Sequence, residues 1–272
     1  MADKGRKVVV ITGTSSGIGE CMAHQLADLG YTVYGGSLTP DQDKTHEGLE
    51  SLFLDVASDD AVQAFVDQIL AKEDKVDVLV NNAGYAYAGP IEDTPFEEAE
   101  AIMNVNFYGA VRLCKALLPT LRTTGGAKIL NVTSGAGFTA EPYAGFYSAS
   151  KFALEGYTEA LRHELWPLDV QVVLIQPGWI RTKIAINAKR VATVQPVYKE
   201  RWERMANLVE DFVLQGMDQD DCARKIVSVV QRRKPRWRYP IGKDVRSSFW
   251  SRKFFPSRVF EHFVRVYYKL HF

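Results

Sequence analysis

The sequence contains only three cysteines, Cys21, Cys114 and Cys222, and no apolar run near the roughly 20 residues of a membrane-spanning helix. An odd number of widely spaced cysteines argues against a disulfide framework and against a zinc site, so we expect free thiols. The first seven residues, Met-Ala-Asp-Lys-Gly-Arg-Lys, lack the apolar stretch of a signal peptide. These absences predict a cytoplasmic protein.

Other features that the chain lacks are internal repeats and linkers rich in Pro, Gly or Ser. Hydrophobic residues make up 46% of the 272 residues and charged residues 24%, which excludes disordered, collagen-like and coiled-coil classes. We therefore expect one globular domain.

Charge is balanced overall, with 33 Lys/Arg and 33 Asp/Glu, but it is distributed unevenly. Residues 231–272 carry 12 Lys/Arg and 2 Asp/Glu, a net charge of +10, which leaves −10 for residues 1–230. This tail also holds 11 of the 31 aromatic residues. A basic, aromatic segment can bind nucleic acid or an anionic membrane surface, or it can pack as a flap on the acidic body. We favour the flap and expect no nucleic-acid partner.

Short apolar runs alternate with helical patterns along the chain. Strands are expected at 8–12, 31–34, 52–56, 76–80, 128–133 and 170–176, and helices follow most of them, including 61–70, 96–121 and 147–165. Strands joined by single helices pair in parallel through right-handed crossovers. Strands that are apolar throughout are covered by helices on both faces. The pattern predicts an α/β fold with a single doubly wound parallel sheet of the Rossmann type.

The first predicted strand leads into a glycine-rich turn, Thr-Gly-Thr-Ser-Ser-Gly-Ile-Gly, at residues 12–19. Glycines let a backbone turn sharply and approach a pyrophosphate, whose charge is met by the amides and the dipole of the next helix. A turn needed only for packing is the alternative. The position between a first strand and a first helix favours phosphate binding.

Tyr147 and Lys151 lie four residues apart in a predicted helix and therefore share one face. An ammonium beside a phenol lowers the phenol's pKa, so the pair suits acid/base work on an alcohol or carbonyl. Tyr239 and Lys243 repeat the spacing, but an intervening proline and glycine would break a helix. That second pair is expected in a loop or at a strand end.

Two polar segments follow predicted strands at the carboxyl edge of the sheet, where doubly wound folds bind ligands. Ser134 could donate a hydrogen bond to a substrate oxygen. Alternatively, its hydroxyl could hydrogen-bond to the backbone of its own turn. Asn81-Asn82-Ala83-Gly84 follows the strand at 76–80, where asparagines also suit an ordinary loop.

Taken together, these residues resemble the classical short-chain dehydrogenases/reductases over about residues 6–245. Residues 147–156 and the Tyr-Pro-Ile-Gly-Lys-Asp segment at 239–244 look most like the 17β-hydroxysteroid and retinol dehydrogenase branch. The resemblance implies these cofactor-binding residues: Gly13, Ser15, Ser16, Gly17, Ile18, Gly19, Ser37, Asp55, Val56, Asn82, Ala83, Gly84, Tyr147, Lys151, Pro177, Gly178, Ile180 and Thr182.

The mechanism that the resemblance implies is hydride transfer between a nicotinamide cofactor and a carbon bearing oxygen. Tyr147 would be the acid/base, Lys151 would lower its pKa and hold the ribose, Ser134 would orient the substrate oxygen, and Asn106 would order a relay water. The resemblance implies no metal. It does imply a homodimer or a homotetramer. A non-catalytic cofactor-binding or scaffold protein on the same fold is the alternative, but it would be expected to lose one of these residues.

The sequence departs from the family after the second strand, where Ser37 and Leu38 replace the acidic residue expected for NAD and the arginine expected for NADP. We favour NADP(H) slightly over NAD(H), because no carboxylate at position 37 would repel the phosphate. Aromatic residues in loops at the carboxyl edge predict an apolar pocket for a steroid-, retinoid- or lipid-like substrate. They are Tyr85, Phe138, Tyr143 and Trp179, with Tyr87 and Phe146 nearby.

Two stripes of apolar residues at helical spacing lie near the carboxyl end, and each has more than one possible role. The first stripe recurs at helical spacing and could form part of the core or a lid over the substrate. Its residues are Tyr198, Trp202, Met205, Val209 and Phe212. Residues 257–270 predict an amphipathic helix, which could lie on an anionic bilayer or close over the substrate site or a partner subunit. We favour closure. The domain is expected at 1–245, with 246–272 as a basic, aromatic extension of the same domain.

Overall fold

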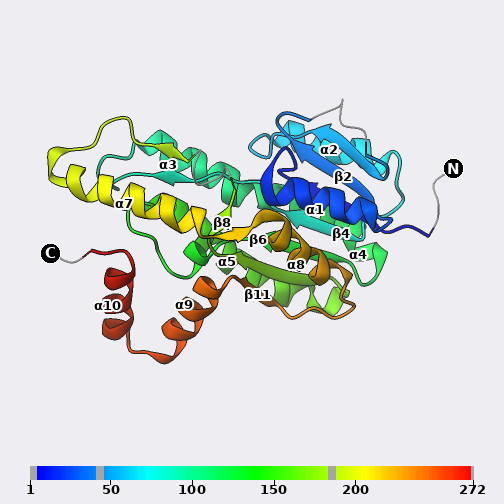
Figure 1. The fold of residues 1–272 in the computed structure, drawn as a ribbon. Helices are drawn as coiled ribbons and strands as arrows, with labels where there is room; N and C mark the ends of the chain where they lie inside the picture. The colour runs from blue at the N-terminus through cyan, green and yellow to red at the C-terminus, as the bar shows by residue number, and fades with distance from the viewer. Residues whose placement is uncertain (1–4, 41–45, 183–187, 271–272) are drawn as a thin grey trace.

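The apolar runs form one parallel sheet in the computed structural model, which describes residues 5–40, 46–182 and 188–270 (Figure 1). Its seven strands lie in the order β11-β7-β6-β4-β1-β2-β3. Their bounds are β1 Val8–Thr12, β2 Thr32–Ser37, β3 Leu49–Phe53, β4 Val78–Asn81, β6 Lys128–Val132, β7 Gln171–Pro177 and β11 Arg238–Ile241. The strand order reverses between β1 and β4, and this switch point is where doubly wound sheets bind ligands.

Helices cover both faces of the sheet because neighbouring strand residues point to opposite sides. Val9 and Ile11 of β1 pack against α1 (Gly17–Asp28) and α8 (Gln219–Gln231). Val8 and Val10 pack on the other face, with α2 (Asp59–Leu70), α4 (Gly109–Thr124) and α5 (Gly145–Leu165). The predicted two-sided fold is therefore confirmed.

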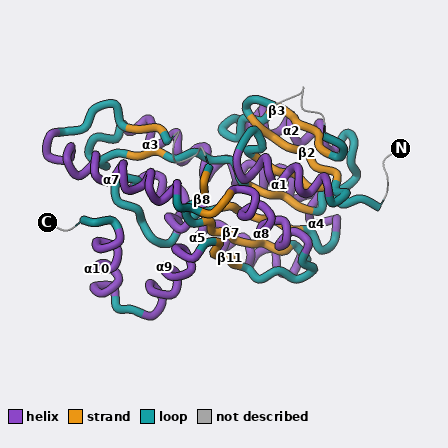
Figure 2. The backbone as a smooth tube through the Cα atoms, in the orientation of Figure 1, coloured by secondary structure: helices purple, strands orange, loops and turns teal. Residues whose placement is uncertain are grey.

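Shorter elements gather beyond the carboxyl ends of the strands. β5 (Tyr87–Ala88) pairs with β9 (Lys189–Arg190), and β8 (Ile180–Arg181) pairs with β10 (Met217–Asp218). The 3-10 turn η2 (Gly135–Gly137) follows β6, and η3 (Trp166–Leu168) follows α5. α7 (Pro196–Leu214) lies beside these pairs (Figure 2).

Two secondary-structure predictions need correction, and a third is confirmed. The strand predicted at 52–56 is β3 at Leu49–Phe53, because the chain enters the sheet at Gly48, whose φ of 83° favours glycine. The helix predicted at 96–121 is divided into α3 (Phe96–Met103) and α4 by the π-helical turn η1 (Asn104–Tyr108). The Tyr239 and Lys243 pair was expected in a loop or at a strand end, and Tyr239 lies near the end of β11. β11 pairs on one side with β7, and such an edge strand tolerates Pro240.

The basic tail contacts the rest of the chain through its last helix and the residue after it. α9 (Lys243–Phe254) spans the expected boundary at residue 245, and α10 (Ser257–Tyr267) turns back toward α7. Tyr267 stacks on Phe212 of α7 with ring centroids 4.7 Å apart. Tyr268 is buried with Met205 and Leu208.

Two further features bear on the sequence predictions. Cys21, Cys114 and Cys222 are buried free thiols. Within the described ranges, no helix combines the length and apolar character needed to cross a membrane.

Candidate active site

The glycine turn after β1 has the backbone geometry that a phosphate cradle requires. Gly13 and Gly17 have φ values of 74° and 66°, which side chains other than glycine rarely adopt. A side chain at Gly19 would collide with the carbonyl oxygen of Gly13. α1 begins at Gly17, so its unpaired backbone amides face the turn. Ser15, Ser16 and Ile18 lie within this turn and the start of the helix.

The segment after β4 is a clamp on this turn. The backbone amides of Asn82 and Ala83 donate to the Thr12 hydroxyl at 3.0 and 2.9 Å. The Asn82 side-chain amide donates to the carbonyl oxygens of Thr12 and Gly13 at 3.0 and 3.2 Å. The segment is a loop whose polar groups hold the glycine turn in place.

Thr182 faces the cradle from the other side of the crevice. A Cβ on Gly17 would lie 3.8 Å from the Thr182 side chain. Thr182 is buried, and its hydroxyl has no hydrogen-bond partner among the described residues. A buried hydroxyl without a partner is costly unless a ligand satisfies it. The glycine cradle and this hydroxyl fit a nicotinamide cofactor.

The remaining expected cofactor contacts lie around the same crevice. Ser37 is buried at the end of β2, whereas the next residue, Leu38, is 63% exposed. Asp55 accepts a hydrogen bond from the Ala57 amide at 2.9 Å, and Val56 is buried. Pro177, Gly178 and Ile180 lie at the carboxyl end of β7 and in β8, next to Thr182.

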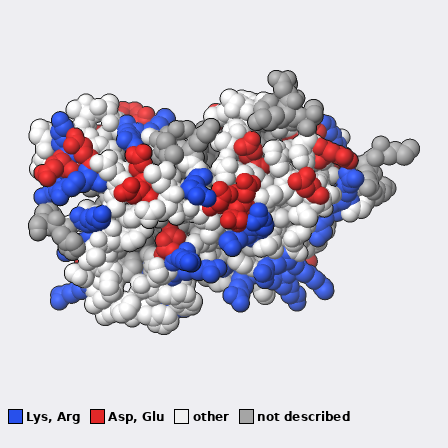
Figure 3. Space-filling model, viewed as in Figure 1, with Lys and Arg blue, Asp and Glu red and all other residues white. Residues whose placement is uncertain are grey.

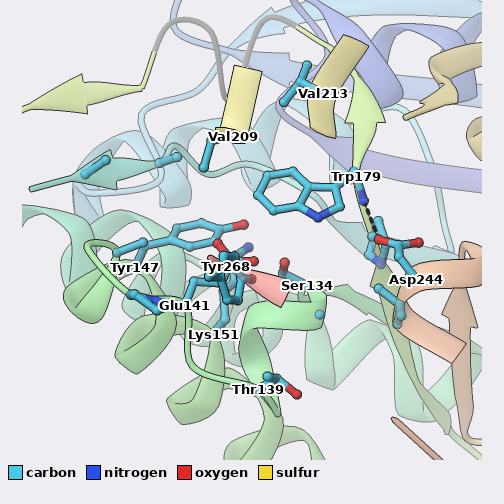
Figure 4. Close-up of a pocket in the computed structure, with 18 of the residues that line it drawn as sticks. Ser134, Thr139, Glu141, Tyr147, Lys151, Trp179, Val209, Val213, Asp244 and Tyr268 are labelled. Carbon is cyan, nitrogen blue, oxygen red and sulfur yellow. Dashed lines mark hydrogen bonds between the residues drawn. The ribbon is translucent and has the colours of Figure 1, made fainter. Parts of the chain in front are cut away.

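α5 places Tyr147 and Lys151 on one face, opposite Ser134 (Figure 4). The Ser134 hydroxyl accepts from the Ala136 amide at 3.1 Å and is close enough to Tyr147 to act on the pKa of its phenol. Lys151 Nζ lies 5.9 Å from the centroid of the Tyr147 ring and donates to the Val132 carbonyl oxygen at 3.2 Å. The three residues predicted from spacing therefore lie together.

The pKa values of this pair differ from the expectation. Burial and the charge of Glu141 raise the pKa of Tyr147 to about 12, against the lowering effect of the Ser134 hydroxyl. Burial lowers the pKa of Lys151 to about 8, although the charge of Glu155 acts to raise it. The net direction for Tyr147 is therefore opposite to the lowered pKa expected from Lys151, because burial is the largest influence on both groups.

Glu155, one turn beyond Lys151, was not identified from the sequence. It accepts hydrogen bonds from Thr133 Oγ1 at 2.7 Å and from Gln176 Nε2 at 2.8 Å, and it forms a salt bridge with Arg238 at 2.6 Å. The network joins β6, β7, β11 and α5, strand and helix positions that no local pattern connects. It fixes a negative charge close to Lys151.

Asn106 lies in the π-helical turn, with its side chain buried. Its side-chain amide donates to the Tyr85 carbonyl oxygen at 3.0 Å and to Ser150 Oγ at 3.1 Å, and its oxygen accepts from the Tyr85 amide at 3.0 Å. A Cβ at Gly84 would lie 2.9 Å from that oxygen and 3.5 Å from Lys151 Nζ. Asn106 thus shapes the site beside Lys151, and its water-ordering role stays a prediction.

A cavity of about 520 Å³ opens from Ser134 and Tyr147 and is lined by Tyr85, Tyr143 and Trp179 as predicted. Phe138 is not among its lining residues; η2 turns the chain, and the Phe138 ring packs on Phe249 of α9 at 5.6 Å. Phe146 packs with Tyr87 and Ile102 instead. The predictions for Phe138 and Phe146 are therefore wrong.

Helices far along the chain complete the cavity. From α7 come Trp202, Met205, Ala206, Val209 and Val213, and from α10 and the residue after it Phe260, Phe263, Val264, Val266, Tyr267 and Tyr268. Trp179 Nε1 donates to the Tyr267 hydroxyl at 3.0 Å, which ties the two sides together. The favoured prediction that the tail helix closes over the site is confirmed, and α7 is part of the same wall.

Residues 7–192 match the family described as short chain dehydrogenase. The chain belongs to this family. A curated relative, the 3-ketodihydrosphingosine reductase of Bacteroides thetaiotaomicron, is 34% identical over 267 residues, covering 97% of this chain and 98% of that protein. The family and its intact site identify an NAD(P)-dependent oxidoreductase.

Solved structures superpose on this fold. An alcohol dehydrogenase from the archaeon Thermococcus sibiricus, complexed with 5-hydroxy-NADP, has a TM-score of 0.72 at 26% identity and covers 87% of this chain and 96% of its own. A short chain dehydrogenase/reductase from Burkholderia phymatum, in complex with NAD, has a TM-score of 0.77 at 25% identity and covers 93% and 96%.

Proposed function

We propose that this protein transfers a hydride between NADP(H) and a lipophilic secondary alcohol or its ketone. The observation that carries this proposal is the composition of the cavity. Its polar end holds Ser134 and Tyr147, and its other walls, from α7 and α10, are mostly apolar. Such a cavity favours a substrate with one oxygen at the reacting end and an apolar body.

The comparisons support a lipid-like substrate. The name of the Bacteroides relative denotes reduction of a keto group on a lipid-like molecule. The likeness of residues 147–156 to the 17β-hydroxysteroid and retinol dehydrogenase branch supports the same class. Steroids and retinoids are therefore included in the test below.

Each polar residue has a role that follows from its position. The bound cofactor supplies or accepts the hydride at its nicotinamide ring. Tyr147, with its pKa raised to about 12, is protonated near neutral pH and donates its proton to the carbonyl oxygen during reduction. The Ser134 hydroxyl orients that oxygen, and Lys151 lies where it can hold the nicotinamide ribose.

We base the preference for NADP(H) on the end of β2. Ser37 carries no negative charge that would repel a ribose phosphate, and the exposed Leu38 leaves the position beside it open to solvent. We expect the preference for NADP(H) over NAD(H) to be small, because the predicted motif has no cation that would pair with the ribose phosphate.

The test is a panel of purified ketones with NADPH and with NADH, followed at the nicotinamide absorbance. It contains a long-chain ketone, a steroid ketone, a retinoid carbonyl and a short polar ketone. We expect kcat/KM for the lipophilic ketones to exceed that for the short ketone by at least about tenfold. Preference for the short polar ketone would refute the proposed substrate class.

A second part of the proposal concerns the outer surface of α9 and α10, which we expect to contact anionic membranes. Trp250 and Phe254 stack on each other and are 50% and 70% exposed. Arg252, Lys253 and Arg258 lie among these aromatic residues. Figure 3 shows a mostly uncharged surface over the two helices, with Lys and Arg at its margins. Aromatic rings among cations suit the headgroup region of an anionic bilayer.

Vesicle sedimentation tests this contact. The double variant Trp250→Ser/Phe254→Ser should lose binding to anionic vesicles at low salt, and high salt should release the wild type. Trp166→Ser is the matched control, because Trp166 is 72% exposed but lies in η3. Equal sedimentation of wild type and double variant would contradict the membrane contact.

A further inference from the structure

The cavity contains two carboxylates, and only one of them has a structural partner. Asp244, at the start of α9, accepts a hydrogen bond from the Trp179 amide at 2.9 Å. Side chains at Gly178 and Gly242 would collide with its carboxylate, so the chain packs closely around it. Glu141 also lines the cavity, but its side chain forms no hydrogen bond or ion pair with any residue that the structure describes.

The backbone around Glu141 is held firmly in place. The Glu141 amide donates to Ser148 Oγ at 3.0 Å, and the Glu141 carbonyl oxygen accepts from the Ala144 amide at 3.2 Å. Tyr143 has a φ of 60°, a left-handed conformation that is unfavourable for a bulky residue, and its carbonyl oxygen accepts from the Gly89 amide at 2.7 Å. Strain of this kind persists where the surrounding structure enforces it, and it concentrates at functional sites.

Glu141 lies at the reacting end of the cavity. In Figure 4, Glu141 lies on the left with Tyr147, Tyr268 and Lys151, and Asp244 lies on the right. The ionisable groups that feel its charge are Tyr147 of α5, Tyr267 and Tyr268 at the end of α10, and Asp244 of α9. None of these four groups is a cation. Among the described residues, the cations that line the cavity are Lys151, which donates to the Val132 carbonyl oxygen, and Arg190, and neither forms an ion pair with Glu141.

An acid in such surroundings is unfavourable in its charged form. Burial and the charge of Asp244 raise the pKa of Glu141 to about 7. Glu141 is half-buried, and a carboxylate in such a position is stabilised when a cation with N–H donors binds to it. The natural complement of Glu141 is therefore a cationic group that enters with the substrate.

We propose that Glu141 binds a protonated amino group that the substrate carries beside its reacting carbonyl or alcohol carbon. This inference rests on the proposed function and narrows it to lipophilic amino ketones and amino alcohols. The ammonium donates to the Glu141 carboxylate, while the neighbouring oxygen lies between Ser134 and Tyr147. The apolar chain extends between α7 and α10, so each part of the substrate meets a wall of matching chemistry.

The experiment compares three ketones of equal chain length near neutral pH: a long-chain 2-amino-3-ketone, its N-acetyl derivative and the unsubstituted 3-ketone. The wild type should reduce the free amine with a kcat/KM at least about tenfold above the two neutral ketones. Glu141→Gln keeps the size of the side chain but removes its charge. It should raise KM for the free amine about 10- to 100-fold and change the neutral ketones less than about threefold.

Glu159→Gln is the matched control, because Glu159 lies on the exposed face of α5. It should leave all three ketones unchanged. Direct binding of a long-chain 2-amino-3-alcohol, measured by calorimetry on folded protein, should weaken for Glu141→Gln and not for the control.

Each outcome separates the two proposals. If Glu141→Gln alters all three ketones by the same factor, or if the wild type shows no preference for the free amine, the amine site is refuted while the proposed function stands. If the wild type reduces none of the three ketones but reduces another lipophilic ketone of the panel above, the amine site is refuted and the proposed function stands. If it reduces no lipophilic ketone of either set, the proposed function is refuted, and the amine site with it.

Discussion

Replacing Glu141 by glutamine should stabilise the protein, even though it removes a charge that we assign to substrate binding. The folded state raises the pKa of this carboxyl from 4.5 to about 7. Between these pH values the folded chain binds more protons than the unfolded chain, so the free energy of unfolding falls as pH rises. Glutamine carries no charge at any pH and avoids this loss.

The size of the gain follows from the pKa. One pKa unit corresponds to about 1.36 kcal/mol, so the wild type loses at most about 3 kcal/mol above about pH 7. Water in the cavity and relaxation around the charge reduce this cost, and we expect about 1 to 2 kcal/mol. For a chain of this size, that corresponds to an increase in Tm of about 2–8 °C.

Thermal unfolding followed by circular dichroism, without cofactor, measures this difference. Wild type, Glu141→Gln and Glu159→Gln are compared from about pH 5 to about pH 8. The advantage of Glu141→Gln should be largest at the upper end and mostly lost at the lower end. A gain that is independent of pH, or a less stable Glu141→Gln protein at about pH 8, would refute the reasoning.

Four other perturbations test the site. Tyr147→Phe should lower kcat by at least about a thousandfold while cofactor binding, measured by fluorescence titration, changes little, because the phenol proton is needed only in the chemical step. Lys151→Ala should weaken both cofactor binding and turnover; an effect on rate alone would exclude the ribose contact. Leu38→Arg should favour NADP over NAD by about 1.5 to 3 kcal/mol in kcat/KM, and an unchanged ratio would place cofactor selection elsewhere. A chain that ends at Phe255 should lose turnover of long-chain ketones, because α10 forms one wall of the cavity; turnover equal to that of the full chain would exclude α10 from the substrate site.

Much of the site was predictable because its determinants are local. Apolar runs of β-branched residues specified the strands, and the alternation of Val8, Val9, Val10 and Ile11 matches the two faces that they fill. The glycine turn needs particular backbone angles at Gly13 and Gly17, which the residue type itself reveals. A spacing of four in a helix was sufficient to place Tyr147 and Lys151 on one face.

Tertiary structure decided what depends on segments far apart in the chain. Phe138 left the cavity because η2 directs it against Phe249, more than a hundred residues later. The Tyr147 pKa is governed by burial and by Glu141, and neither can be read from the Tyr-Lys spacing. The sequence by itself determined strands, turns and helix faces, since these depend on interactions between near neighbours. The walls of the cavity and the charge inside it depend on α7, α9 and α10 meeting the sheet edge, and only packing of the whole chain brings them there.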